Sequence, residues 1–251
     1  MIGIGIGIPR YYNLGGGGEP PAPFSPLDIP NLKSWHDATQ GITLVEGNVN
    51  SWADQSGNNF HLTAPTSGQR PSYGPVLLNG VPIVDSLTGN KKLYVPNYNL
   101  NAALQGATIF FVAAQYPGDG SFGRFVSANY GQQFWTGRQS SNNEIGGAFL
   151  ANTEPYGTPQ SATNGVFYTA MYLGTTTNVR MSLNGGTLPS PYNYTGTFTP
   201  GGMAFFNGAD AIDSTYDSRK AIAEVIIYDR TLTIAEYTQV LTYLKDKWGH
   251  Y

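Results

Sequence analysis

Carboxylates are the side chains best suited to catalysis in this sequence, because it has no cysteine and only three histidines. Glycoside hydrolysis needs two carboxyl groups that flank the scissile bond, and a pattern such as E-x-D-x-x-E on one strand would supply them. That pattern is absent, and the glutamates are scattered along the chain as Glu19, Glu46, Glu144, Glu154, Glu224 and Glu236. A pair assembled from distant loops stays open, but the sequence predicts no catalytic residue.

The histidines and the short motifs of other enzyme classes give no stronger indication of catalysis. His36, His61 and His250 are not spaced as metal ligands, and H-E-x-x-H, G-x-S-x-G and G-x-x-x-x-G-K-[ST] are all absent. Asp54 opens a dense turn, residues 54–59, in which its carboxylate should accept backbone N–H groups as an Asx-turn. We therefore expect His61, which follows this turn, to be a packed or hydrogen-bonded turn residue.

One stretch has the ligands that calcium prefers. Asp210, Asp213 and Asp217 crowd residues 208–218, between two predicted strands. Hard oxygen ligands on a flexible loop suit Ca²⁺. The spacing matches no dedicated calcium loop, however, and aspartates are also common in Asx-turns and on solvated surfaces. We keep the three aspartates as a candidate calcium site and expect no other cofactor.

A second stretch has the composition of a glycan site. Residues 129–138 combine aromatic, amide and guanidinium groups, and the candidates are Asn129, Tyr130, Trp135 and Arg138. Sugar rings pack their C–H faces on aromatic rings while polar groups bind the hydroxyls. The competing interpretation is that Trp135 belongs to a strand core. Residues 192–194 form a second, shorter candidate.

Composition excludes several classes of protein. The 251 residues carry a net charge of −3 with a pI of about 5.5, and only 12% of them are charged. Nucleic-acid binding needs clustered Lys and Arg in excess, so no nucleic-acid partner is expected. No run of about 18 apolar residues occurs, so membrane insertion is not expected. Many glycines, prolines and aromatics with few charges indicate a β-rich globular chain.

Short strand-like runs recur along the chain and predict its architecture. The clearest are residues 42–45, 49–52, 107–115, 166–173, 179–183 and 221–228. One helix is expected after them, with Thr233 as N-cap, Glu236 completing a capping box and Gly249 ending the helix. Its apolar stripe is Tyr237, Val240, Leu241, Leu244 and Trp248. The predicted fold class is all-β, an antiparallel β-sandwich jelly roll with one C-terminal α-helix and an extended N-terminal arm.

The N-terminal arm, residues 1–26, differs from the rest. Ile2, Ile4, Ile6 and Ile8 alternate with glycine, which gives a strand with one isoleucine face and one bare face. Four glycines at 15–18 and a Pro-rich stretch at 20–26 then supply a hinge and a stiff spacer. The start lacks the basic region and cleavage site of a secretory signal. We predict an assembly arm and linker over 1–26 and a jelly-roll domain over 27–251.

Three segments, 29–38, 49–73 and 223–249, together resemble a known family. They contain the stretches SWHDA, SWADQSGNNFHL and AEVIIYDRTL, and end in YLKDKWG. They are similar to the concanavalin A-like, laminin-G-like jelly-roll domain found in bacteriophage virion proteins and bacterial surface proteins. The place of the family's F-D-G-like stretch is taken by Val84, Asp85 and Ser86, a partial match, and the middle of the chain matches only as strand-rich sequence.

The resemblance implies a non-enzymatic bacteriophage virion structural protein. It would be a capsid decoration, head-fibre or tail-associated subunit, located in the virion and anchored to other virion proteins by its N-terminal arm. A homo-oligomer within the assembly is expected. The alternative is a carbohydrate-binding adhesin or lectin module that recognises a host-surface glycan. A glycan hydrolase or lyase is the least favoured class, since one fold carries many functions.

Overall fold

The structure is a computed structural model, and it describes residues 23–87, 90–98, 106–116, 123–128, 134–139, 144–149, 160–161, 167–174, 178–186, 192–193, 201–208 and 219–249. The strands are β1 (Leu32–Asp37), β2 (Ile42–Val45), β3 (Asn48–Trp52), β4 (Leu62–Thr63), β5 (Ser72–Leu78), β6 (Val81–Asp85), β7 (Leu93–Tyr98), β8 (Ala107–Gln115), β9 (Gly123–Ala128), β10 (Phe134–Gln139), β11 (Glu144–Phe149), β12 (Gln160–Ser161), β13 (Phe167–Gly174), β14 (Asn178–Leu183), β15 (Tyr192–Asn193), β16 (Gly201–Phe205) and β17 (Lys220–Tyr228). The helices are the 3₁₀ turns η1 (Pro26–Asp28) and η2 (Ser67–Gln69) and the α-helix α2 (Ile234–Trp248).

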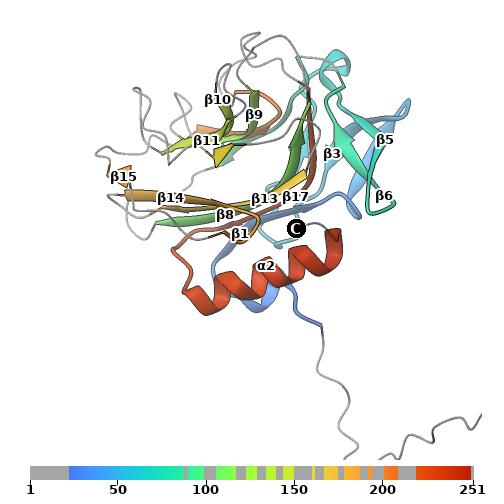
Figure 1. The fold of residues 1–251 in the computed structure, drawn as a ribbon. Coiled ribbons are helices and arrows are strands. Elements are labelled where there is room, and N and C mark those ends of the chain that lie inside the picture. Colours follow the sequence, from blue (N-terminus) through green and yellow to red (C-terminus); the bar gives the residue numbers. More distant parts are fainter. Residues whose placement is uncertain are drawn as a thin grey trace, which may run out of the picture.

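The described strands pair antiparallel throughout and form a β-sandwich, as the sequence predicted. One layer runs β14, β13, β8, β17 and β1 in spatial order. The other runs β7, β16, β9, β10 and β11. Figure 1 shows the two layers facing each other, with the β2–β6 hairpins at one side. Because the chain crosses between layers, sequence-distant strands become neighbours, above all β1 beside β17.

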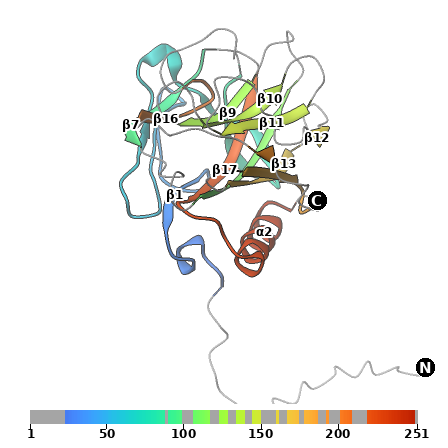
Figure 2. The ribbon, with the colours of Figure 1, turned by 90° about the vertical axis from the view of Figure 1, so that its left-hand side faces the viewer.

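The strands at the centre of the first layer supply much of the core. All nine residues of β17 are buried, and β8, its antiparallel neighbour, is buried from Ala107 to Ala114. Largely apolar runs suit strands that are covered on both faces, although β17 also buries Lys220 and Glu224. One face of this layer packs inside the sandwich, and α2 lies across the outer face (Figures 1 and 2). The predicted strand positions at 107–115 and 221–228 are therefore confirmed.

Helix α2 forms as its sequence predicts. Thr233 and Glu236 make the reciprocal capping box, with Glu236 N donating to Thr233 Oγ1 at 3.3 Å and Thr233 N donating to Glu236 Oε2 at 2.9 Å. Gly249 ends the helix in the left-handed region at φ 65°. Arg230, unexpected from the pattern, adds two bonds to the Glu236 carboxylate, at 2.9 and 2.6 Å. Across the described residues no helix has the length and apolar character needed to cross a membrane.

The described chain begins on the domain surface beside α2. Ser25 caps η1 through a capping box with Asp28, and the hydroxyl of buried Tyr228 donates to Pro26 O at 3.0 Å. The Phe24 ring meets the Tyr243 ring edge-on, with centroids 5.9 Å apart. Residues 23–28 are therefore tied to the sandwich. The isoleucines predicted to anchor the protein, Ile2, Ile4, Ile6 and Ile8, lie outside the described residues.

Candidate functional site

The most unusual titratable group in the described residues is Glu224, a fully buried carboxylate in the middle of β17. Four donors surround it. Its Oε1 accepts from Trp35 Nε1 at 2.6 Å and from the Tyr243 hydroxyl at 2.9 Å. Its Oε2 accepts from Trp248 Nε1 at 2.6 Å and lies 2.9 Å from Lys247 Nζ. A buried charge of this kind persists only when it is paired and hydrogen-bonded.

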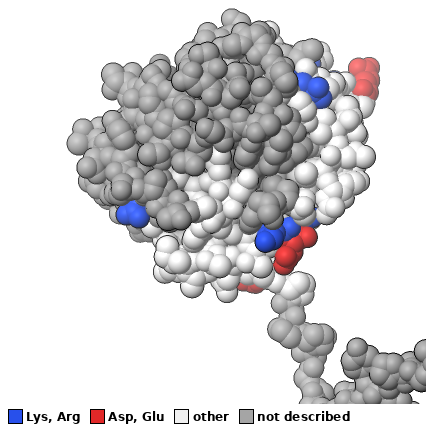
Figure 3. Space-filling model, viewed as in Figure 1, with Lys and Arg blue, Asp and Glu red and all other residues white. Residues whose placement is uncertain are grey.

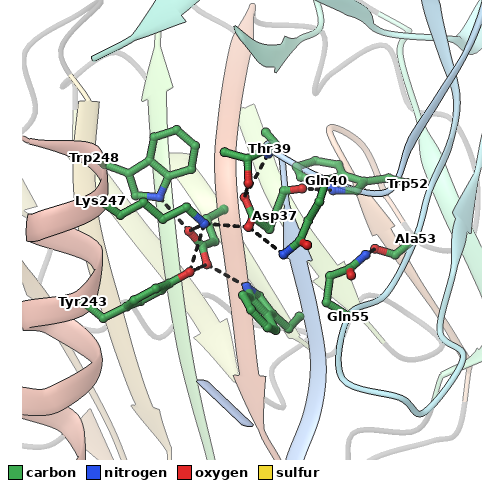
Figure 4. A network of polar contacts seen from close by, with 12 residues as sticks. Asp37, Thr39, Gln40, Trp52, Ala53, Gln55, Tyr243, Lys247 and Trp248 are labelled. Carbon is green, nitrogen blue, oxygen red and sulfur yellow. Dashed lines mark hydrogen bonds and ion pairs between the residues drawn. The ribbon is translucent and has the colours of Figure 1, made fainter. Parts of the chain in front are cut away.

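Lys247 connects Glu224 to a second buried carboxylate, Asp37, at the end of β1. The Lys247 ammonium lies 2.6 Å from Asp37 Oδ2. The same oxygen accepts from Gln40 Nε2 at 2.9 Å, and Oδ1 accepts from Thr39 N and Oγ1 at 2.9 and 2.8 Å. Figure 4 shows Lys247 reaching from α2 toward Asp37, with Tyr243 and Trp248 beside it. We call Trp35, Asp37, Glu224, Tyr243, Lys247 and Trp248 the Glu224 cluster.

The electrostatics of the Glu224 cluster fit a structural ion pair. Burial raises the pKa of Glu224, while the Lys247 ammonium and the Trp248 indole act in the opposite direction. Indole and ammonium groups can only donate hydrogen bonds, so three of the four groups around Glu224 favour its ionised carboxylate. Burial and the adjacent carboxylate raise the pKa of Tyr243, which keeps its hydroxyl proton on the bond to Glu224.

This geometry gives Glu224 no access to a substrate. A general acid or base must reach the atom it protonates or deprotonates, directly or through one water. Both Glu224 oxygens already hold two donors each, and the residue has no exposed surface. Glu224 and Asp37 therefore act as the polar core that joins β1, β17 and α2, and not as a carboxylate pair for glycoside hydrolysis.

A second polar centre surrounds Asp54 and confirms the predicted turn. Asp54 Oδ1 accepts from Ser56 N at 2.9 Å, which is the Asx-turn, and also from Trp35 N at 2.9 Å. Oδ2 accepts from Phe60 N at 3.0 Å and Ser56 Oγ at 2.8 Å. His61 Nδ1 accepts from Asp54 N at 3.0 Å, so His61 is a hydrogen-bonded turn residue as expected. The link from Asp54 to β1 was not expected.

His36 is a core residue with an unusual environment. Its ring is fully buried, edge-on to Trp52 and Phe205, with Nε2 3.1 Å from Phe60 O. Nδ1 has no hydrogen-bond partner within the described part of the chain. Burial lowers the pKa of His36 to about 4, against smaller opposing effects of Asp54 and Phe60 O. A neutral imidazole can donate from Nε2 to the Phe60 carbonyl, and Nδ1 is then an acceptor without a partner among the described residues.

Asp85, in the partial F-D-G-like stretch, is also held by structural bonds. It is buried and ion-paired with Arg219, whose Nε lies 3.2 Å from both carboxylate oxygens and whose NH2 nitrogen lies 2.5 Å from Oδ2. Leu87 N donates to Asp85 Oδ1 at 2.6 Å. Asp85 therefore ties the end of β6 to the residue that precedes β17.

The three segments that carry the family resemblance meet at these centres. Trp35 and Asp37 come from the first segment, Asp54 from the second, and Glu224 and Lys247 from the third. Trp35 joins all three, because its backbone N donates to Asp54 and its indole donates to Glu224. In the structure these segments thus meet in contacts that hold β1, β17 and α2 together. The ion pairs of Lys247 are not indicated by any local pattern in the sequence.

The predicted ligand sites are not tested by the described residues. Asn129, Tyr130, Asp210, Asp213 and Asp217 lie outside them. Trp135 and Arg138 lie on β10, which pairs with β9 and β11, but their side chains are not described. Among described side chains no group of three His, Cys, Asp or Glu could hold a metal ion. The glycan and calcium sites remain predictions.

Few Lys, Arg, Asp and Glu side chains are visible among the described residues in Figure 3. A basic and an acidic side chain lie side by side at the lower right, and the described charges form no patch of one sign. Nucleic-acid-binding faces concentrate basic side chains. The described part of this face has no such concentration.

Comparison with known proteins places the chain by fold only. No family model and no curated protein sequence matches it. Among solved structures, a Trypanosoma rangeli sialidase in complex with sialic acid has a TM-score of 0.60 and 12% identity, over 87% of this chain and 33% of the sialidase chain. The binding domain of botulinum neurotoxin DC in complex with SialylT has a TM-score of 0.59 and 16% identity, over 88% and 52%. The same domain solved with rat synaptotagmin II gives the same values.

These neighbours agree with a β-sandwich fold. The chain spans about a third of the sialidase and about half of the neurotoxin binding domain. At such identities the likeness concerns the fold and not the activity of either protein. The all-β sandwich with one C-terminal helix, predicted from sequence, is confirmed.

Proposed function

We propose that this chain is a non-enzymatic structural protein of a tailed-bacteriophage virion. It would be a capsid decoration, head-fibre or tail-associated subunit, displayed in several copies and anchored by its N-terminal arm. The observation that carries the proposal is the use of the buried carboxylates. Glu224, Asp37, Asp54 and Asp85 are all saturated by backbone, indole, ammonium or guanidinium donors. The described residues of the three resembling segments therefore make contacts that hold the domain together. Such a stable domain suits a subunit displayed on a particle.

The anchoring role is supported by the sequence of the arm. Among the described residues, Phe24 makes a ring contact with the domain, and further contacts follow through η1. The alternating isoleucines precede these contacts by at least 15 residues, since Ile8 is the last of them. Such a strand can add to the exposed sheet edge of a neighbouring subunit through backbone hydrogen bonds.

Purified phage particles test this proposal. The genome that encodes the chain should be edited to produce either the full protein or a form that lacks residues 1–22. We expect the full protein in density-purified particles at a fixed copy number, and the shortened protein in the lysate as a soluble folded domain. A full-length protein absent from purified particles would contradict the virion role.

Glycan recognition is a second candidate, and one observation favours it. Two of the fold neighbours were solved with sialic acid or SialylT, although this chain matches only part of each. Residues 129–138 are the candidate site on this chain. A glycan array with the full chain should then give a signal that a Trp135→Ala, Arg138→Ala double variant loses. The absence of any signal would leave the structural role alone.

A further inference from the structure

A groove of about 690 Å³ lies between the first described residues and α2, on the outside of the sandwich (Figure 2). Small-molecule sites typically have volumes of about 300–1,000 Å³. Pro23 and Phe24 form one wall of the groove. The other wall is one face of the helix, made by Thr238, Gln239, Thr242, Tyr243, Asp246 and Lys247. The groove is therefore large enough for a small-molecule ligand.

The two aromatic rings of the groove are held in place. The Phe24 ring meets the Tyr243 ring edge-on, with centroids 5.9 Å apart, and both side chains are partly buried. The Tyr243 hydroxyl is bonded to Glu224 and to Lys247 Nζ, which fixes the position of its ring. Fixed aromatic rings are surfaces on which a sugar packs its C–H faces.

Several polar atoms of the lining are already used inside the protein. Thr238 Oγ1 donates to Ile234 O at 2.8 Å, and Thr242 Oγ1 donates to Thr238 O at 2.9 Å. Lys247 Nζ is ion-paired within the Glu224 cluster. These side chains therefore add mainly carbon surface to the groove.

Gln239 and Asp246 are different, because both side chains are exposed and neither has a hydrogen-bond or ion-pair partner among the described residues. Gln239 lies four residues before Tyr243 and Asp246 lies three residues after it, so the three share one face of the helix. From Gln239 to Asp246 the helix rises about 10.5 Å at about 1.5 Å per residue. A fixed aromatic ring thus lies between a free amide and a free carboxylate.

We propose that this groove binds a neutral saccharide. Its rings would pack against Phe24 and Tyr243, and its hydroxyls would bond to Gln239 at one end and to Asp246 at the other. A hydroxyl group both donates and accepts hydrogen bonds, so it can satisfy a carboxylate, which only accepts, and an amide, which does both. The lining contains one acidic and one basic residue, so its net charge is zero, as suits a neutral ligand.

Other kinds of ligand fit these polar groups less well. A wholly apolar segment would remove Gln239 and Asp246 from water without replacing their hydrogen bonds. A cation could pair with Asp246, but it only donates, so the amide hydrogens of Gln239 would stay unpaired. An acidic sugar would bring a like charge to Asp246. The expected ligand therefore differs from the sialic acid bound by one of the fold neighbours.

This groove is separate from the candidate glycan site at residues 129–138. Helix α2 covers the outer face of the layer that contains β17, whereas β10 belongs to the other layer (Figure 1). Binding in the groove requires neither that site nor the virion role, so each can fail without the others.

A glycan array that carries neutral and sialylated glycans, probed with the labelled full chain, tests the groove. The test variant is Gln239→Leu with Asp246→Leu, at two exposed positions. The control is Lys245→Leu, an exposed position of the same helix outside the groove. We expect neutral glycans to bind wild type and the control equally. The test variant should bind them at least about tenfold more weakly, the loss expected when a hydrogen bond to a charged group is removed.

Two further comparisons make the result specific to this groove and to a neutral ligand. The Trp135→Ala, Arg138→Ala variant should bind neutral glycans as wild type does, and high salt should change the affinity little, because screening weakens only charged contacts. Failure of every neutral glycan to bind would overturn the proposal. Equal binding by the test variant and wild type, or a preference for sialylated glycans, would overturn it as well.

Discussion

Lys247 Nζ lies 2.6 Å from Asp37 Oδ2, so the last turn of the C-terminal helix is ion-paired to the end of the first strand. The same ammonium lies 2.9 Å from Glu224 Oε2 on the strand between them. Replacement of Lys247 would leave two buried carboxylates with their hydrogen bonds but without a counter-charge. The ion pairs of Lys247 therefore hold α2 on the sheet together with the buried side chains of the helix.

Lys247→Met should strongly destabilise the fold. Breaking a buried ion pair by removing one partner typically costs about 3–5 kcal/mol, because the remaining charge stays buried. Urea unfolding followed by tryptophan fluorescence would measure the loss. Lys245→Met is the matched control on the exposed side of the same turn, and a surface substitution of this kind should change stability by less than about 0.5 kcal/mol. Equal effects of the two variants would show that the Lys247 ion pairs contribute little.

Trp248→Ala should cost about 3–5 kcal/mol, as large-to-small aromatic changes in cores do. Trp248 is 1% exposed and its indole donates to Glu224 at 2.6 Å, so the variant removes both packing and a donor. Trp248→Phe keeps most of the ring and removes only the donor, and should lie between wild type and Trp248→Ala. A melting temperature unchanged in Trp248→Ala would refute the docking of α2 on the sheet.

Asp54→Ala should destabilise the domain by about 1–3 kcal/mol through donors left unpaired. Its carboxylate holds Trp35 N on β1 as well as Ser56 N and Phe60 N in its own turn. Asp54→Asn retains one acceptor oxygen and should lose less. Thermal unfolding of both variants provides the measurement, and the reverse order of stability would contradict the assigned role.

Local elements could be predicted from the sequence because their causes are local. The capping box of Thr233 and Glu236, the glycine that ends α2 and the Asx-turn of Asp54 each depend on residues a few positions apart. The Glu224 cluster could not be predicted in this way. Its donors come from β1 and α2, and they meet only because β1 pairs with β17, a register that no local pattern specifies.

The buried carboxylates show that neither the number of acidic residues nor their nearness identifies a catalytic site. In the sequence Glu224 is one of six scattered glutamates that form no catalytic pattern. In the structure Glu224 and Asp37 share a lysine, an arrangement that resembles a catalytic pair until the donors are counted. Saturation of both Glu224 oxygens, and not the spacing of the carboxylates, identifies the cluster as structural.

The free energy of unfolding should decrease as pH is lowered, because His36 is buried in its neutral form. Its pKa is about 4 in the folded protein and about 6.5 when unfolded, so the unfolded state binds more protons between these values. The stabilisation from neutral His36 is fully present above pH 6.5. As pH falls toward 4, the free energy of unfolding decreases by up to about 1.4 kcal/mol per pH unit. Urea unfolding at several pH values should show this slope in wild type and a shallower one in His36→Phe. Parallel pH profiles would rule out His36 as the titrating group.

Deletions should separate the N-terminal arm from the domain. Removal of residues 1–22 keeps Phe24, the Ser25 cap and Pro26 O, so we expect a loss below about 1 kcal/mol and a folded domain. Removal of residues 1–26 takes away all three contacts and leaves the buried Tyr228 hydroxyl without its acceptor. An unpaired buried donor costs about 1–3 kcal/mol. For a domain of this size, each kcal/mol lowers the melting temperature by about 2–4 °C.

Calorimetry on the two deletions gives the comparison. Tyr228→Phe in the 1–26 deletion is the control, because it removes the unpaired hydroxyl. Unfolding of the 1–22 deletion would mean that the arm closes an edge of its own sandwich, and the assembly role would then lose its physical basis.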